Sequence, residues 1–195
     1  MFSTTFLGHQ GWSFRAGQTQ LLVDPLLTSR FGHGGGVGAV YPPRDFDFDH
    51  FPPIDAVLIT HEHEDHFDVP SLARLDRHIP ILLSANSSAA ARGLLSEMGF
   101  AVRFVRGGET VTVGDLTIDL FAADHVRVAQ SDEWDVLQFV VHDRNGDGSF
   151  VSGVDCAMSL KTVLEIKRIV GRRGLWCFTN NITHWTFLEG GSVFA

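Results

Sequence analysis

The sequence predicts an α/β fold of four layers, an αββα sandwich in which two packed β-sheets lie between outer helices. Strand patterns alternate with helix patterns in both halves of the chain, and histidine and carboxylate residues follow directly after predicted strands. The 195 residues are 44% hydrophobic, which suits one compact domain with a sizeable core. We therefore expect one domain over residues 1–195, with its functional residues along one rim.

The first half of the chain begins as a β-meander. Short strands are predicted at 2–7, 12–15, 20–23, 56–60 and 79–83. The segment 24–53 loses periodicity, and loops of this length are usually functional or disordered. A short helix is expected at 69–75. A second helix should be capped by Asn86, bury Ala91, Leu95 and Met98, and end at Gly99.

The second half returns to strand patterns. Strands are expected at 102–105, 110–113, 116–122, 136–141, 149–151 and 175–178. A helix with Leu160, Val163, Leu164 and Val170 on one side should end near Gly171 or Gly174. The turn at 143–148 copies the first half of a calcium-binding loop, but Val154 occupies the position of its terminal acid. We therefore favour a hairpin turn there.

Composition limits the possible functions. The formal charge of −8 and the pI near 5.6 argue against a nonspecific nucleic-acid binder, which needs a basic surface. No segment has the pattern of a signal peptide or a membrane span. The two cysteines, Cys156 and Cys177, do not form a disulfide framework or a zinc knuckle. A soluble, cytoplasmic protein is expected.

The most informative segment is residues 61–66, His-Glu-His-Glu-Asp-His, which follows the predicted strand at 56–60. That strand brings the segment to the edge of the core, where unpaired imidazoles and carboxylates are unfavourable. In an extended segment His61 and His63 point to the same side about 7 Å apart, so both imidazoles can reach one ion. The alternative is a solvated acidic loop, but a metal site explains the pattern better.

The pattern of His61, His63, Asp65 and His66 resembles the metallo-β-lactamase superfamily of metal-dependent hydrolases. Segments at 6–9, 22–25, 54–61, 108–111 and 122–125 resemble the branch that contains ascorbate-phosphate-type lactonases and N-acylphosphatidylethanolamine phospholipases. The resemblance covers roughly residues 6–155. It implies a metallo-β-lactamase-like αββα sandwich whose second half is shortened at the C-terminus.

The resemblance also implies a set of ligands for two divalent ions. His61 and His63 would bind the first ion, and His125 would complete that site. Asp65 and His66 would bind the second ion. Asp155 would bridge both ions, so Asp65 and Asp155 are also the candidate catalytic residues. Val154 looks like an insertion between Gly153 and Asp155, and a local bulge could restore the aim of the carboxylate.

The C-terminus departs from the family pattern, because relatives continue through another αβ unit before their last histidine ligand. Either His184 replaces that ligand, or the chain lacks it. An exposed sheet edge there would favour self-association or a partner chain.

The resemblance implies that a metal-bridged hydroxide cleaves a small ester, lactone or phosphoester. Zinc is the expected metal, although manganese and iron accept the same ligands. Two alternatives stay open: an iron-dependent oxidoreductase, and a non-enzymatic scaffold that needs a partner. A nucleophilic role for Cys156 is disfavoured because no histidine base is evident. His9 and His33 are candidates for substrate contact.

Overall fold

The computed structural model describes residues 1–32, 36, 38–40, 51–123, 136–146 and 148–171, together with the backbone of 174–178. His33, His125, His184 and the segment 41–50 therefore lie outside the described residues. The prediction of one domain over 1–195 stays a prediction for the same reason.

The first sheet has six strands in the order β1-β2-β3-β6-β7-β8. Its strands are β1 (Phe2–Gly8), β2 (Gly11–Ala16), β3 (Thr19–Val23), β6 (Ala56–Ile59), β7 (Ile81–Ser84) and β8 (Val102–Val105). The first three strands form the predicted antiparallel meander, and β3, β6, β7 and β8 pair in parallel. Parallel strands bring their carboxyl ends to one edge, which places the loops after β3 and β6 side by side.

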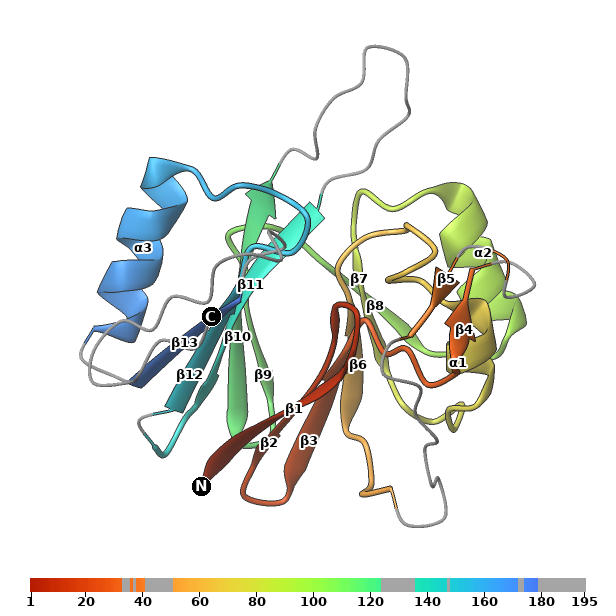
Figure 1. Cartoon of the computed structure of the whole chain (residues 1–195), viewed down its shortest axis with the longest axis horizontal. Helices are drawn as coiled ribbons and strands as arrows, with labels where there is room; N and C mark the ends of the chain where they lie inside the picture. Colours follow the sequence, from red (N-terminus) through yellow and green to blue (C-terminus); the bar gives the residue numbers. More distant parts are fainter. Residues whose placement is uncertain are drawn as a thin grey trace.

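Two helices, α1 (Val69–Ala73) and α2 (Ala89–Glu97), cover the outer face of this sheet (Figure 1). The cap of α2 is Ser88 rather than the predicted Asn86, because the Ser88 hydroxyl accepts the Ala91 N–H at 3.1 Å. Gly99 follows the end of this helix with a φ of 86°, as its predicted role as a terminator requires. A small sheet of β4 (Arg30–Phe31) and β5 (Gly38–Ala39) lies in the loop after β3.

The second sheet has the order β13-β12-β11-β10-β9. Its strands are β9 (Thr110–Val113), β10 (Leu116–Ala123), β11 (Val136–Asp143), β12 (Gly148–Ser152) and β13 (Gly174–Phe178). Strands β9 to β12 are antiparallel, and β13 runs parallel to β12. The segment after β11 joins it to β12 as the predicted hairpin.

The helix α3 (Leu160–Val170) covers the second sheet with a face that differs from the predicted one. Its buried residues are Thr162, Ile166 and Val170, whereas Leu160 and Leu164 are 75% and 58% exposed. Two apolar stripes run along this short helix, and Ile166 and Val170 belong to the one that packs against Phe121. Periodicity alone cannot choose between two such stripes.

The main core lies between the sheets and confirms the αββα architecture. Trp12 and Phe14 from β2 meet Phe150 from β12, with ring centroids 4.7 and 4.9 Å apart. Phe14 and Phe139 are almost completely buried. Burial of each such side chain contributes about 1.5–3 kcal/mol to folding. This core fixes the two sheets relative to each other, and with them the loops at their ends.

The loop between β6 and α1 and the loop between β12 and α3 lie at the same end of the sandwich (Figure 1). The backbone of Leu137 in β11 donates to the carbonyl of Thr60 at 3.1 Å, which ties the sheets together at this rim. Within the described part of the chain, no helix has the length and apolarity needed to cross a membrane.

Candidate metal centre

Three candidate ligands from two distant segments of the sequence meet at this rim. The Nε2 atom of His61 lies 3.3 Å from Oδ2 of Asp155, and Nε2 of His66 lies 3.1 Å from the same oxygen. Both histidines are buried, and Asp155 is partly exposed. Among the described residues these three form a group whose ligand atoms all lie within 4.8 Å of one another. The predicted convergence of His61, His66 and Asp155 therefore occurs.

His63 joins this group from the loop that follows β6. Its Nδ1 atom lies 2.9 Å from Nε2 of His61, and the ring centroids are 4.6 Å apart. The backbone N–H groups of His66 and Phe67 both donate to the His63 carbonyl, so the chain turns here. This turn sends His66 back toward the centre.

Asp65 lies beside the group and contacts His9. Its Oδ2 atom is 2.6 Å from Nε2 of His9 and 3.7 Å from Nε2 of His66. His9 has a positive φ of 49°, and its side chain is 40% exposed. His9 therefore lies on the exposed side of the centre, and its contact with a substrate stays a prediction.

Asp24 fixes the orientation of His66 through Nδ1, the ring nitrogen that does not contact Asp155. It follows β3, is 1% exposed, and accepts from the Thr60 N–H at 2.8 Å and the Thr60 hydroxyl at 2.6 Å. Its Oδ2 atom lies 2.7 Å from Nδ1 of His66. A carboxylate only accepts hydrogen bonds, so Nδ1 carries a proton and Nε2 is the ring nitrogen that faces the centre.

We had predicted no role for Asp24 from the sequence. The available signal was its position directly after a buried strand that pairs in parallel with the strand before His61. A second missed contact involves Glu62, whose carboxylate accepts from the backbone and the hydroxyl of Ser88. This contact ties the ligand loop to the start of α2.

The buried charges shift the pKa values of the ligands. Burial lowers the pKa of His61, and this outweighs its hydrogen bond to Asp155. Burial also acts to lower the pKa of His66, but the charge of Asp24 and the hydrogen bonds to Asp155 and Asp24 raise it to about 10. The metal-free centre therefore holds a proton on His66 at neutral pH.

The two carboxyl groups shift in the opposite direction. Burial acts to raise the pKa of Asp155, but the hydrogen bonds from His61 and His66 hold it well below its usual range. For Asp65, burial is outweighed by the hydrogen bond from His9 and the charge of His66, which lower the pKa to about 2. Both carboxylates are therefore ionised and available as ligands.

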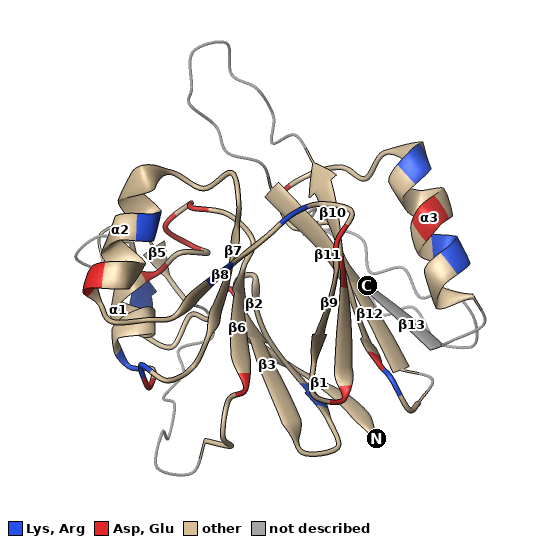
Figure 2. Cartoon of the chain, turned by 180° about the vertical axis from the view of Figure 1, so that it is seen from behind, with Lys and Arg blue, Asp and Glu red and all other residues tan. Residues whose placement is uncertain are grey.

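The donor set fits a divalent metal ion. Ligand atoms bound to one tetrahedral ion at about 2 Å stand about 3.3 Å apart, and the separations of 3.1 and 3.3 Å at Asp155 match this value. The set combines imidazole and carboxylate without sulfur, which suits zinc, manganese or iron. Acidic residues also gather in the loop after β6 (Figure 2), and their field attracts cations.

The turn that carries Asp155 accommodates Val154 in an uncommon conformation. Val154 is 2% exposed, belongs to the core between the sheets and has a φ of 52°. The Cys156 N–H donates to the Gly153 carbonyl at 3.1 Å and closes the turn. The extra residue thus does not prevent Asp155 from reaching the two histidines. Cys156 is half-buried.

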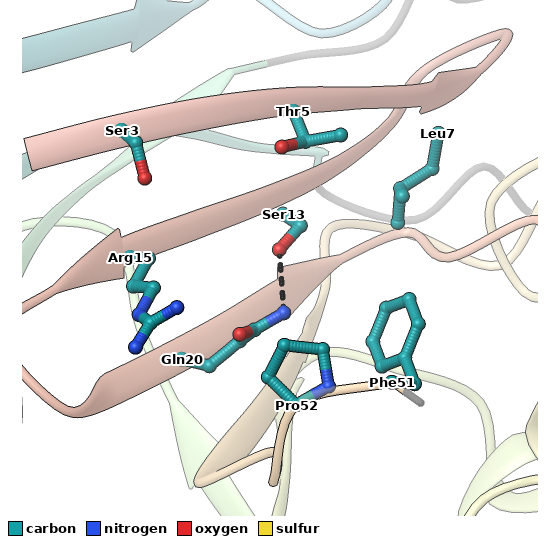
Figure 3. A pocket seen from close by; sticks show the side chains of 8 residues that line it. All are labelled: Ser3, Thr5, Leu7, Ser13, Arg15, Gln20, Phe51 and Pro52. Carbon is teal, nitrogen blue, oxygen red and sulfur yellow. Dashed lines mark hydrogen bonds between the residues drawn. The ribbon is translucent and has the colours of Figure 1, made fainter. Parts of the chain in front are cut away.

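A separate cavity of about 280 Å³ lies on the outer face of β1, β2 and β3 (Figure 3). Ser13, Arg15, Gln20 and Phe51 are among its lining residues, and the Gln20 amide donates to the Ser13 hydroxyl at 2.9 Å. None of its lining residues is a candidate ligand, so this cavity does not belong to the metal centre.

The sequence of the chain matches a known protein family and several curated relatives. The model of a family described as the β-lactamase superfamily domain matches residues 3–167. A UPF0173 metal-dependent hydrolase of Ruegeria sp. strain TM1040 is 30% identical over 123 residues, which are 62% of this chain and 47% of that protein. The chain spans about half the length of the curated relatives that it matches.

Solved structures share the fold. An isothiocyanate hydrolase from Delia radicum gut bacteria has a TM-score of 0.63 and 18% identity, covering 85% of this chain and 66% of that one. CmlA, a diiron β-hydroxylase from Streptomyces venezuelae, has a TM-score of 0.62 and 22% identity, covering 89% of this chain and 33% of that one. At these identities the likeness concerns the fold alone.

Proposed function

The chain belongs to the β-lactamase superfamily, and we propose that it is a metal-dependent hydrolase whose metal centre includes His61, His66 and Asp155. The observation that carries this proposal is the convergence of two imidazole nitrogens and one carboxylate oxygen within 4.8 Å at the rim. The relative from Ruegeria, named a metal-dependent hydrolase, supports the same reaction class.

The residues of the centre have distinct tasks in this proposal. His61, His63, His66 and Asp155 hold the metal, and Asp24 orients His66 through Nδ1. Bound divalent ions would activate water and stabilise the negative charge that develops on a substrate oxygen. Asp65 and His9 lie on the exposed side of the centre, where they can contact the water and the substrate.

We further propose that the centre holds two ions, with zinc as the expected metal. Asp65 and His66 would hold the second ion, Asp155 would bridge the ions, and His125 and His184 would supply the remaining ligands. If His184 is a ligand, metal analysis should find two ions per chain in the wild type and one in the His184→Ala variant. An unchanged count would reject this role.

The proposed substrate is a small ester, lactone or phosphoester. The segments that resemble the lactonase and phospholipase branch support this class, and the net charge of −8 disfavours nucleic acid. The two cysteines of the sequence lack the spacing of a disulfide framework, which suits a reducing compartment, so we propose a cytoplasmic location. We also propose that the chain self-associates through a sheet edge. Light scattering tests this through the molar mass in solution, and the mass of a single chain would contradict it.

An iron-dependent oxidation is the second candidate, because the sulfur-free donor set also accepts iron. The fold relative CmlA is itself a diiron β-hydroxylase. Metal analysis of protein purified without chelator separates the candidates. Zinc or manganese supports hydrolysis, and iron with visible absorption supports oxidation.

The direct test is a hydrolysis assay with a nitrophenyl ester, a homoserine lactone and a nitrophenyl phosphodiester. We expect turnover of at least one substrate that chelator abolishes and added zinc or manganese restores. The Asp155→Ala variant should be inactive. The matched control is Asp143→Ala, which removes a carboxylate from the other end of the β11–β12 hairpin. No metal-dependent turnover of any of the three substrates would contradict the proposal.

A further inference from the structure

The turn that carries Asp155 is held by a side chain from the neighbouring strand, Gln138 of β11. Gln138 is 1% exposed and pairs with Phe121 of β10. Phe139 faces the core between the sheets, and Gln138 lies on the opposite face of the strand, as does Val140. From this face its side chain reaches the turn between β12 and α3.

The Gln138 amide makes two hydrogen bonds to this turn. Its Nε2 atom donates to the carbonyl of Gly153 at 3.2 Å and to the carbonyl of Cys156 at 3.1 Å. Both neighbours are acceptors, so only the NH2 end of the amide can face them. The two carbonyls stand on either side of Asp155 in the sequence, so Gln138 fixes both ends of the segment that carries the ligand.

This segment needs external support because of Val154. A β-branched residue rarely adopts a φ of 52°, and a conformation of this kind persists only where its surroundings enforce it. The Ser152 hydroxyl accepts the Val154 N–H at 3.0 Å and the Cys156 N–H donates to Gly153. The two bonds from Gln138 complete the set that holds the turn.

The carbonyl end of the Gln138 amide indicates the role of this residue. Within the described part of the chain, the buried Oε1 atom of Gln138 has no hydrogen-bond partner. Burial of an unpaired oxygen is unfavourable, and an apolar side chain would fill this space without that penalty. The contribution of the amide is therefore the pair of bonds that its NH2 group makes.

We propose that Gln138 is a positioning residue that aims the Asp155 carboxylate at His61 and His66. The inference rests on the proposed metal centre and adds a residue that does not itself bind the metal. Without the two bonds the turn can relax toward ordinary backbone angles, and the carboxylate then leaves the position 3.1–3.3 Å from the two imidazoles.

The test compares cobalt(II) binding by the full chain and by three variants. Gln138→Met keeps the length of the side chain and removes the donor, and Gln138→Glu keeps the shape and places a carboxylate against two carbonyls. Ser149→Ala is the matched control, because Ser149 is a buried polar residue of the same sheet whose hydroxyl has no hydrogen-bond partner among the described residues. Each protein is titrated with cobalt(II) while the visible absorption of the bound ion is recorded.

We expect both Gln138 variants to bind cobalt about 10- to 100-fold more weakly, with an altered visible spectrum. Ser149→Ala should match the wild type. The thermal midpoint of metal-free Gln138→Met should stay close to that of metal-free Ser149→Ala, because the substitution changes the position of the Asp155 carboxylate.

Three results would overturn the inference. The first is wild-type affinity and spectrum in both Gln138 variants. The second is a loss of affinity that also occurs in Ser149→Ala or that accompanies unfolding of the metal-free variants, since this would reveal a merely structural role. The third is a wild type that binds no cobalt, which would refute the proposed metal centre as well.

Discussion

Replacing Asp24 by Asn should weaken both the fold and the metal centre. Asparagine keeps the size of the side chain and tolerates the positive φ of 44° at this position. It can still accept the Thr60 N–H through its carbonyl oxygen. Its NH2 group, however, then occupies the position of the oxygen that faces Nδ1 of His66 at 2.7 Å.

The loss of stability follows from the burial of this pair, since His66 and Asp24 are 0% and 1% exposed. Removing one partner of a buried ion pair costs about 3–5 kcal/mol, and the retained bond to Thr60 favours the lower end of this range. For a domain of this size, 3 kcal/mol corresponds to a fall of roughly 6–12 °C in the thermal midpoint.

The loss of metal affinity has a different cause. An NH2 group beside Nδ1 favours the tautomer that carries its proton on Nε2, and that nitrogen can then no longer bind a metal. The disturbance of such an orienting partner lowers metal affinity about 10- to 100-fold.

The assay is thermal unfolding of the metal-free chain near neutral pH, followed by circular dichroism, together with zinc competition against a chelating dye. Asp55→Asn is the matched control, because Asp55 is an exposed carboxylate that accepts one backbone N–H, from Gln20 at 2.7 Å, near the start of β6. It should cost about 1 kcal/mol and leave zinc affinity unchanged. If Asp24→Asn behaves like Asp55→Asn in both measurements, the assigned role of Asp24 is wrong.

Three further predictions concern the same rim. His66 is protonated in the metal-free fold because its pKa is raised from 6.5 to about 10, so its contribution to stability is full below pH 6.5 and disappears as the pH rises through about 10. Metal binding needs the neutral ring, so zinc added near neutral pH should release about one proton per chain from His66, and an indicator dye that registers none would contradict this. Asp65 has its pKa lowered from 3.8 to about 2, so its contribution to folding stability is present above pH 3.8 and disappears as the pH falls through about 2. His9→Ala should raise the pKa of Asp65 in an NMR titration. An unchanged pKa would show that His9 does not act on Asp65. Ser88→Ala removes the cap of α2 and a donor to Glu62, so urea unfolding should show a loss of about 1 kcal/mol that the exposed Ser96→Ala lacks.

Much of the fold and part of the centre could be predicted from local patterns. The apolar run before His61 identified a buried strand, and a strand that ends in ligands places them at a rim. The strand and rim predictions succeeded because the direction of a side chain near a strand end follows from the strand itself. Asp155, which lies in the turn after β12, was instead predicted from the resemblance to the metallo-β-lactamase superfamily.

The features that could not be predicted from the sequence are contacts that no local pattern encodes. The packing face of α3 depends on the surface that Phe121 and Val140 offer, and both stripes of the helix are apolar enough to fit. The contact between Gln138 and the turn at 153–156 depends on the register of β11 against β12. His125 and His184 lie outside the described residues and stay predictions.

The most direct test of the central claim is an anomalous difference map, recorded at the zinc absorption edge, from crystals of the chain grown with zinc. We expect one peak about 2 Å from Nε2 of His61 and a second peak about 2 Å from Nε2 of His66, each about 2 Å from a carboxylate oxygen of Asp155. A map without a peak among these three residues, from crystals in which zinc occupies other positions, would contradict it.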